Sequence, residues 1–449
     1  MIKSPLDTFD WIVFAVILLT TFAAILWGHL KKTTSKNKTL ETLLMGRRLT
    51  LPLFIATLVA TWYGGIFGVT QIAYEKGLYN LLTQGFFWYA TYLFFALFMV
   101  DKIHRYKAMT LPHMVEKIWG KKAAKISALF NISNLLPVAY IISLGLFLQS
   151  LLGGSLLLMT LLGMFPVLIY SFFGGFRAVI FSDLIQFFVM CSGVFLVVVF
   201  SFQTYGGFSF LQENLPKSHL TLMGNESWGT TLVWGLIALS TLVDPNFYQR
   251  CFATEKVQTA RKGIFFSTII WFAFDLCTTF GALYARVVLP EFESGSAYLS
   301  YSLKVLPSGL RGFFLAGILA TILSTLDSYL FLSGATLSYD LLPQMKISHK
   351  MRYRLSLIFI GTLSLIVAHL FSGNIRSVWK TFGSYSAACL LIPLTLVHFF
   401  PGKIKEKDFL FSTAASFLCV TIWIFLPKNS FWSSIDALYP GALSSLGVI

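Results

Sequence analysis

Apolar segments of about 20 residues recur along the whole chain and are separated by short polar stretches. An α-helix of about 20 apolar residues crosses the hydrocarbon core of a bilayer, so the pattern predicts about twelve membrane-spanning helices. We expect these spans at residues 10–29, 50–73, 79–100, 126–150, 155–174, 180–202, 229–248, 264–289, 309–339, 355–372, 377–400 and 409–427. The predicted fold class is therefore an all-α polytopic membrane protein.

The composition agrees with a chain that lies mostly in lipid. Hydrophobic residues make up 56% of the sequence and charged residues 12%, whereas a soluble domain has about 25% charged residues. The formal net charge of +15 would suit a nucleic-acid-binding protein, but the Lys and Arg residues lie in short loops between apolar segments. That distribution is typical of orientation signals in membrane proteins. We expect contact with the lipid bilayer and none with nucleic acid.

Basic residues are concentrated in alternate loops, which sets the expected orientation. These loops are residues 31–48, 102–125, 250–262, 346–354 and 403–407. The loops between them are poor in cations and include Glu213, Glu226, Glu291 and Glu293. The positive-inside rule places the basic loops in the cytoplasm and both chain ends outside. We expect a multi-pass protein of the cell inner (cytoplasmic) membrane.

One predicted span, residues 309–339, carries an unusual set of oxygen-bearing side chains. On a helix, Thr321, Ser324, Thr325 and Ser328 fall on one face, and Asp327 lies at its edge. Oxygen-only ligands on one face suit a small hard cation such as sodium. The stripe is therefore a candidate ion site within the bilayer.

Two predicted spans contain helix-breaking residues. The second span has Gly64, Gly65 and Gly68, and the seventh has Pro245. Breaks in corresponding spans of two halves indicate a transporter binding site at the bilayer midplane, although small residues also serve close helix packing. Spans two to six and seven to eleven would form two halves of inverted topology, because each half has an odd number of spans.

Charged residues within apolar spans each need a physical reason, because their insertion is unfavourable. We favour an ion or proton role for Asp183 and Asp327, and structural pairing for Asp244 and Arg286 near helix ends. For Asp275 both interpretations stay open. HExxH and P-loop motifs are missing from the sequence, and we expect no enzymatic activity.

Three motifs together resemble the sodium:solute symporter family. They are Gly174-Gly175-Phe-Arg-Ala-Val-Ile-Phe-Ser-Asp183-Leu-Ile-Gln186, then Gln249-Arg250 with Ala253, Ala260, Arg261 and Gly263, and finally Leu323–Ser328 followed by Tyr339-Asp340. The resemblance covers roughly residues 40–400. It implies a leucine-transporter-type fold, a five-plus-five inverted repeat with two broken helices. The implied segments are 49–202 and 229–400 for the two repeats, with peripheral transmembrane helices at 1–30 and 408–427.

The resemblance also implies sodium ligands. The hydroxyls of Ser324 and Thr325, the carbonyl of Thr321 and carbonyls near Ala60 and Tyr63 would hold one ion. Some family members bind a further sodium at positions equivalent to Asp183, Ser324, Asp327 and Ser328. In this chain Asp327 replaces a hydroxyl residue of those members, so the second site would bind sodium or carry a proton.

The solute should bind at the midplane between the two broken helices. The residues expected to line its site are Trp62, Tyr63, Gly64, Gln71, Ser240 and Thr241. The predicted function is that of a secondary active transporter that imports a small organic solute with Na⁺ as coupling ion, through alternating access. A proton-coupled symporter and a non-transporting sensor of the same fold stay as alternatives. We expect no obligate protein partner.

Overall fold

The computed structural model describes residues 6–30, 37–172, 175–342, 346–371, 374–426, 432 and 435–449. The described residues form helices and connecting segments, without a β-strand among them. The basic positions at 31–36 and Gly174 of the predicted glycine pair lie outside these ranges.

Within the described ranges, nine helices are long and apolar enough to cross a membrane. Some of them are built from consecutive segments. They are α1 (Thr8–Leu30), η2 (Leu81–Phe86) with α5 (Phe87–Phe94), η3 (Phe95–Met99) and α6 (Val100–Arg105), α8 (Lys121–Leu135) with α9 (Val138–Leu152), α11 (Phe176–Tyr205), α15 (Val257–Val288), α17 (Leu310–Ala335) with η6 (Thr336–Leu341), α18 (His349–Leu370), α19 (Ile375–Phe399) and α20 (Glu406–Phe425).

The other three expected spans are short or interrupted. They correspond to α3 (Leu51–Ala60) with α4 (Ile66–Lys76), to α10 (Leu156–Ser171), and to α13 (Trp228–Ala238) with η5 (Leu239–Val243) and α14 (Pro245–Ala253). Shorter helices flank the bundle: α2 (Lys38–Leu44), η1 (Met45–Arg47), α7 (Leu111–Trp119), α12 (Phe208–Asn214), η4 (Lys217–Leu220), α16 (Ser294–Val305) and α22 (Leu438–Val448). All twelve expected spans thus fall on helical segments, and the all-α polytopic fold class is confirmed.

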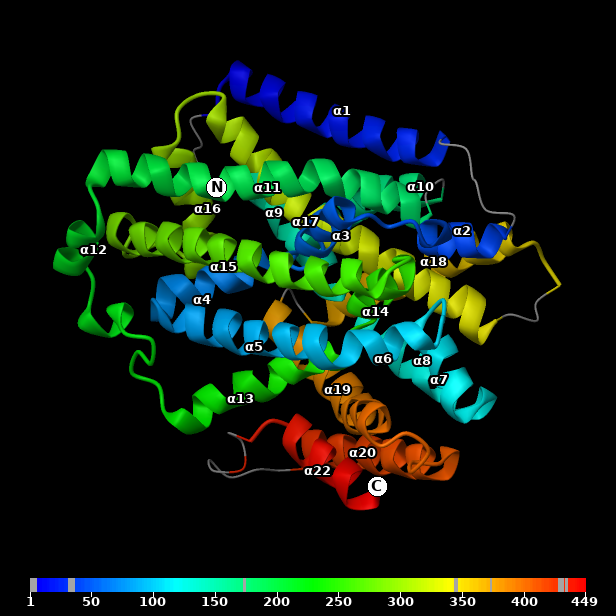
Figure 1. The fold of residues 1–449 in the computed structure, drawn as a ribbon. Coiled ribbons are helices and arrows are strands. Elements are labelled where there is room, and N and C mark those ends of the chain that lie inside the picture. Colours follow the sequence, from blue (N-terminus) through cyan, green and yellow to red (C-terminus); the bar gives the residue numbers. More distant parts are fainter. Residues whose placement is uncertain are drawn as a thin grey trace.

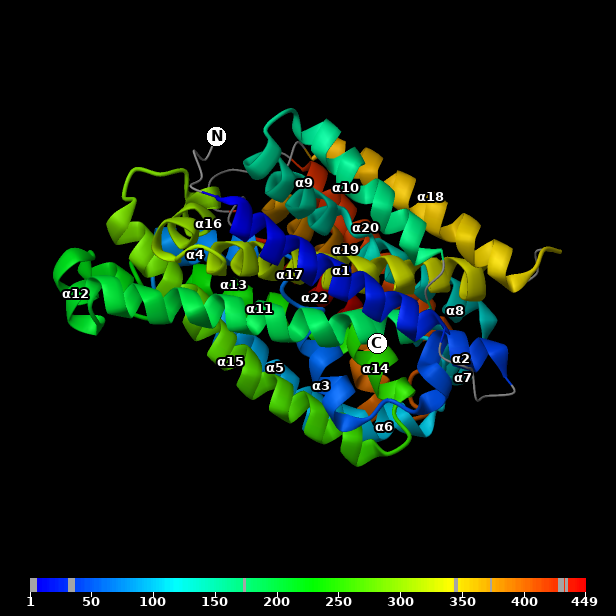
Figure 2. The same ribbon diagram turned by 90° about the horizontal axis from the view of Figure 1, so that it is seen from above.

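The helices are arranged around α17. The most apolar stretch of Leu310–Leu341 is 94% buried, compared with 17% for α1, so α17 is the central helix and α1 is peripheral. Figure 1 shows α1 along α11 at one edge of the bundle and α20 with α22 at the opposite edge. Figure 2, seen from above, shows α10 beside α18 on one flank and α15 on the other.

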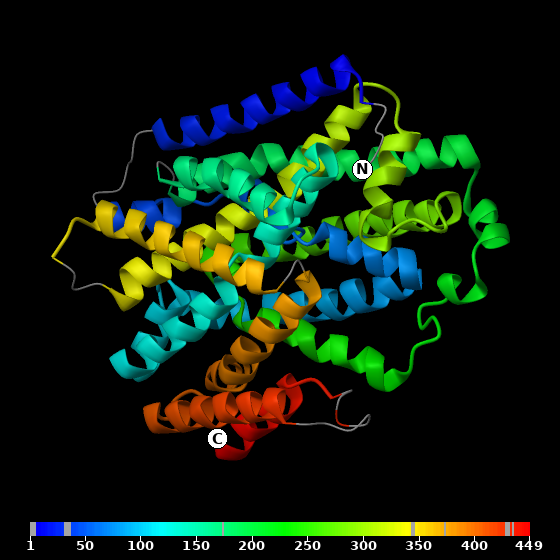
Figure 3. The ribbon, with the colours of Figure 1, turned by 180° about the vertical axis from the view of Figure 1, so that it is seen from behind.

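The ends of the bundle differ in charge. Figures 1 and 3 place α2, α7 and the beginning of α18 at one end, and α12 with the beginning of α13 at the other. The first end carries the basic loops that the sequence predicts to face the cytoplasm. The alternation of loop charge along the chain therefore becomes a separation of charge between two ends of the folded bundle.

Both helix breaks follow from local chemistry. Between α3 and α4 the chain is non-helical around Gly64 and Gly65, residues that favour interruption of a helix. The second break ends at Pro245, the first residue of α14, where a missing N–H is tolerated. Asp244 caps this helix, and its Oδ1 accepts a hydrogen bond from Asn246 N at 2.7 Å.

The N-terminus of α17 is capped from another helix. Asp10 of α1 is buried, and its Oδ1 accepts hydrogen bonds from Gly309 N at 2.7 Å and Gly312 N at 3.1 Å. Gly309 has φ +81°, and a Cβ on Gly312 would lie 1.9 Å from the Asp10 carbonyl oxygen. Glycine is thus required where α1 approaches the beginning of the central helix.

We predict that Asp10→Ala lowers the free energy of unfolding by about 1–3 kcal/mol, because two buried N–H groups lose their acceptor. Asp101→Ala, which removes a partly exposed partner of Arg261, should cost less than about 1 kcal/mol. Thermal unfolding of the purified protein in detergent compares the two. Equal destabilisation by both substitutions would contradict the capping role.

Candidate functional site

The break between α3 and α4 lies against the middle of α17. A Cβ added to Gly64 would lie 2.6 Å from Thr325 Cβ and 2.6 Å from Tyr140 Cδ1. A Cβ added to Gly65 would lie 2.2 Å from Trp379 Cζ2 of α19. These separations are too short for any side chain, so the two glycines allow the broken segment to approach α17 and α19.

This approach gathers four oxygen-bearing groups. Ser324 Oγ donates hydrogen bonds to the carbonyls of Ala60 at 2.6 Å and Thr321 at 3.2 Å, and Thr325 Oγ1 donates to the Thr321 carbonyl at 3.1 Å. Ala60, Ser324 and Thr325 are completely buried, and Thr321 is 1% exposed. The carbonyl of Tyr63, also in the break, accepts a bond from Ile66 N at 3.0 Å.

The chemistry of this cluster fits a monovalent hard cation. It consists of neutral hydroxyl and carbonyl oxygens from two segments, and a bound cation would take the place of the hydrogen bonds between them, with the hydroxyl protons turned away. A divalent or transition metal would favour carboxylate, imidazole or thiolate ligands. The described residues hold no group of three or more His, Cys, Asp or Glu side chains placed to bind such a metal.

The acids proposed for a second ion site have different partners. Asp183 on α11 accepts a hydrogen bond from Thr57 Oγ1, and its Oδ2 lies 3.7 Å from Arg250 Nη2. Asp327 instead accepts a hydrogen bond from Tyr170 of α10. The two carboxylates are thus engaged by different groups.

Arg250 lies at the centre of the Asp183 group. Its guanidinium is completely buried, and Nη2 donates to Thr57 Oγ1 at 2.9 Å and to Ser328 Oγ at 3.1 Å. It also donates to Thr61 Oγ1. The sequence places Arg250 in a cytoplasmic loop, whereas the structure buries it in the bundle. The reason is that α14 begins anew at Pro245 and packs all of its residues inside.

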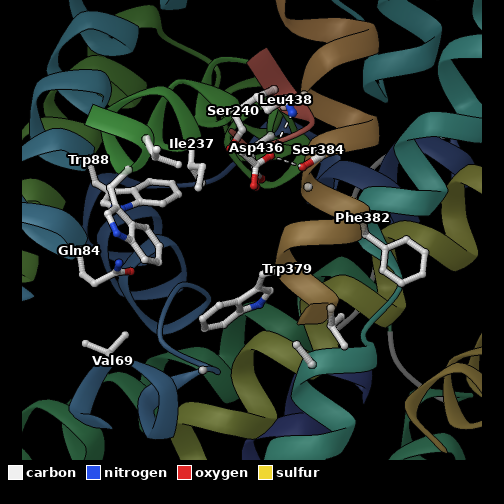
Figure 4. Close-up of a pocket in the computed structure, with 18 of the residues that line it drawn as sticks. Val69, Gln84, Trp88, Ile237, Ser240, Trp379, Phe382, Ser384, Asp436 and Leu438 are labelled. Carbon is white, nitrogen blue, oxygen red and sulfur yellow. Dashed lines mark hydrogen bonds between the residues drawn. The ribbon is translucent and has the colours of Figure 1, made fainter. Parts of the chain in front are cut away.

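A cavity of about 1230 Å³ lies beside the two breaks. In Figure 4, Gln84 and Trp88 lie on one side of it, Trp379 lies on another, and Asp436 borders it together with Ser384. Its wall reaches Ser227 at the beginning of α13, and none of its described lining residues belongs to the basic loops. The cavity therefore extends toward the cation-poor end of the bundle, and the buried Arg250 group lies toward the basic end.

Three of the six predicted solute-site residues line this cavity, namely Trp62, Tyr63 and Ser240. The other three lie elsewhere. Gly64 packs on Thr325, Thr241 is completely buried, and Gln71 Nε2 donates to Glu75 Oε1 at 2.8 Å and to Ser294 Oγ at 3.1 Å.

Sequence reasoning missed most of the cavity wall. Trp88 and Trp271 belong to spans without a helix break, and Trp379 lies near the beginning of α19. The spacing of Trp271 and Asp275, four residues apart on one helix, was a usable signal, because it places an indole and a carboxylate on the same face. Asp436 follows the last long helix in the chain, where no periodicity points to a cavity.

The acids and bases near helix ends behave as structural groups. Asp244 caps α14, and Arg286 Nη1 donates to the Pro290 carbonyl at 2.6 Å. Asp275 accepts a hydrogen bond from Tyr89, and both residues line the cavity. This placement puts Asp275 at the candidate solute site.

Comparison with curated proteins finds transporters of one kind. The chain is 24% identical over 384 residues to a mouse protein named "Sodium/glucose cotransporter 4", covering 74% of this chain and 55% of that protein. It is 26% identical over 272 residues to the sodium/pantothenate symporter of Haemophilus influenzae, covering 54% of this chain and 55% of that protein. The chain thus spans about half the length of these relatives.

Solved structures share the fold at low identity. A Na⁺-coupled sialic acid symporter in a substrate-bound outward-open state has a TM-score of 0.80 at 16% identity, with 98% of this chain and 97% of that chain covered. MhsT in complex with L-phenylalanine has a TM-score of 0.57 at 14% identity, with 89% and 97% covered. These matches confirm the leucine-transporter-type fold.

The sodium:solute symporter family model matches residues 43–400, a range that contains both helix breaks, the α17 oxygen cluster and the Arg250 group. A chain that carries this match over most of its length is a multi-pass membrane protein with a transporter fold. It belongs to the sodium:solute symporter family.

Proposed function

We propose that the chain imports a small organic solute by symport with Na⁺ through alternating access. The observation that carries this proposal is the oxygen cluster of Ala60, Thr321, Ser324 and Thr325 at the break between α3 and α4. Sodium there would join a broken helix to the central helix. Family membership supports the choice of sodium as the coupling ion.

The proposed cycle begins with a cavity open to the outside. Residues 49–202 and 229–400 would form the inverted halves, flanked by peripheral helices within 1–30 and 408–427. The positive-inside rule places the basic loops in the cytoplasm and both chain ends outside. Sodium would favour the outward-open arrangement, solute would permit closure, and loss of sodium to the cytoplasm would allow inward opening. Coupling requires that each ligand binds the two states with different affinity.

The membrane potential supplies a sufficient driving force. One charge that moves through about 100 mV releases about 2.3 kcal/mol. Because a tenfold concentration ratio corresponds to about 1.4 kcal/mol, this energy supports about fifty-fold accumulation of a neutral solute. The sodium concentration gradient adds to it.

We further propose that one sodium is bound per chain. In the second candidate site, the Arg250 guanidinium contacts Ser328 and lies beside Asp183. This positively charged side chain would occupy the place of a second sodium ion. Arg250 also compensates the charge of Asp183, which weakens the case for Asp183 as a proton carrier. Asp327, paired with Tyr170, lies outside the proposed sodium shell.

Sodium should stabilise the purified wild-type protein, and Ser324→Ala/Thr325→Ala should abolish this effect because two ligands are lost. At a sodium concentration of one hundred times Kd, the stabilisation is about 2.7 kcal/mol. Thermal unfolding in sodium against potassium measures it. Ser333→Ala is the matched control, because its hydroxyl also bonds within α17, to the Tyr329 carbonyl at 2.6 Å. A sodium effect that survives in the double variant would place the ion elsewhere.

Equilibrium binding of radioactive sodium should give one ion per chain. Asp327→Asn should leave the sodium affinity within about twofold of wild type, since its carboxylate is outside the proposed shell. Asp183→Asn should lower the free energy of unfolding by about 3–5 kcal/mol, because the buried Arg250 charge loses its partner. Two bound ions in wild type, or loss of one on Asp327→Asn, would contradict the single-site proposal.

Alternating access should change the reactivity of Cys251, which follows Arg250 and is completely buried. In a variant with the other four cysteines replaced by serine, we expect several-fold slower labelling by a maleimide in sodium than in potassium, because sodium favours the state closed at this end. Val69→Cys places a thiol in the cavity wall. This thiol should be labelled faster in sodium than in potassium. Equal rates in both salts at both positions would argue against sodium-dependent access.

A further inference from the structure

The charge of the cavity wall is one-sided. Three carboxylates line it, those of Asp244, Asp275 and Asp436. Among the described residues of the wall there is no Lys, Arg or His side chain. A cleft lined by one sign of charge within a low-dielectric surrounding attracts ligands of the opposite sign and repels those of the same sign. The wall therefore favours a positively charged solute.

Two of the three acids are held in local structure. Asp244 caps α14 through Asn246 N at 2.7 Å. Asp436 Oδ1 accepts bonds from Leu438 N at 3.0 Å and from Ser384 Oγ at 2.9 Å, as Figure 4 shows. Their hydrogen bonds fix the ends of helical segments, and the buried Arg250 compensates part of the Asp244 charge.

Asp275 differs from these two acids. It lies in the middle of α15, is 2% exposed, and its Oδ2 accepts a hydrogen bond from Tyr89. Its Oδ1 is buried and has no hydrogen-bond partner among the described residues. A buried carboxylate without a positive partner is unfavourable in the membrane. A cationic group of a bound solute would supply the partner from the cavity side.

A cluster of aromatic rings lines the same cavity as this carboxylate. Trp271 lies one helical turn before Asp275, and its ring centroid is 6.0 Å from that of Trp62. Trp62 also contacts Trp88 at 5.5 Å and Tyr92 at 5.6 Å between centroids. All four rings line the cavity. Aromatic faces attract ammonium groups through cation–π interactions, and tryptophan does so most strongly.

The cavity wall also offers a hydrogen-bond donor to the solute, and this donor is an uncharged amide. Gln84 lies on the same wall as Trp88, and its buried Nε2 has no acceptor among the described residues. Figure 4 shows the two side chains next to each other. An amide donor at this position would bind a hydroxyl or carbonyl oxygen on the tail of the solute.

We propose that the cavity selects a small organic cation, whose ammonium head pairs with Asp275 and lies against the indole rings of Trp62, Trp88 and Trp271. A hydroxyl or carbonyl oxygen of the solute accepts the hydrogen bond from Gln84. This inference rests on the proposed transport function, because it names the chemical class of the solute that the same site would carry.

The test compares probes that share a shape and differ in charge. Choline, its uncharged isostere 3,3-dimethyl-1-butanol and the anion 3,3-dimethylbutanoate are titrated into the purified full-length chain, in sodium and in potassium. Ethanolamine tests a smaller ammonium head. Tryptophan fluorescence and calorimetry measure binding. We expect choline or ethanolamine to bind at least about tenfold more tightly than the uncharged probe, given a desolvated cation–π site.

The role of Asp275 is tested by Asp275→Asn, which keeps the shape and the acceptor for Tyr89 and removes the charge. It should weaken binding of the cation about tenfold or more while sodium still stabilises the protein. Asp101→Asn is the control, because this acid pairs with Arg261 away from the cavity and should leave cation affinity unchanged. If Asp275→Asn does not fold, the wild-type preference between choline and its uncharged isostere decides the proposal.

Each outcome has one meaning. Equal binding of the charged and uncharged probes, preference for the anion, no binding of either cation at millimolar concentration, or unchanged affinity in folded Asp275→Asn would overturn the proposal. In those cases an intact sodium effect in wild type leaves the proposed sodium coupling standing. Cation binding that persists without any sodium effect would instead overturn the coupling and support the inference about the solute class.

Discussion

The contact between the break after Ala60 and the middle of α17 is the constraint on which the rest of the site depends. Gly64 leaves no room for a side chain against Thr325, so the interrupted helix can approach the central helix closely. That approach brings the Ala60 carbonyl to Ser324 Oγ at 2.6 Å. Carbonyls released from a broken helix need partners within the bundle, and the buried hydroxyl of Ser324 provides one. Under the proposed function, sodium would strengthen the same junction.

A second buried group lies one helical turn further along α17, at Ser328. Arg250 bonds to Thr57 and Ser328 and faces Asp183, so it links α14 to α3, α11 and α17. A charge buried in this way is compensated by its partner and by hydroxyl acceptors. The group would separate the cavity from the basic end of the bundle. Opening of the bundle at its basic end would then require α14 to move, because Arg250 belongs to α14 and holds this group together.

The cavity lies beside both helix breaks and is lined by aromatic and acidic side chains. Trp62 comes from the first break, Asp244 from the second, and Asp275 from the uninterrupted α15. Segments from both halves of the chain therefore meet at one solute-sized space. The described part of its wall carries three acids and no Lys, Arg or His side chain. Asp244 and Asp436 also have structural roles, whereas Asp275 has a buried Oδ1 without a hydrogen-bond partner among the described residues.

The sequence by itself determined the class of fold, the positions of the spans, both breaks and the face of α17 that carries the hydroxyl groups. Hydrophobic segment length, glycine, proline and the spacing of Ser324 from Thr321 are local properties, and the bilayer restricts the structures that such segments can form. Only the tertiary structure decided that Arg250 is buried, that Asp183 and Asp327 have separate partners, and that Gln71 lies away from the cavity. These outcomes depend on how α14 re-enters the bundle and on which helices come into contact. Helical periodicity predicts the face of a helix on which a residue lies, but it does not predict which neighbouring helix that face contacts.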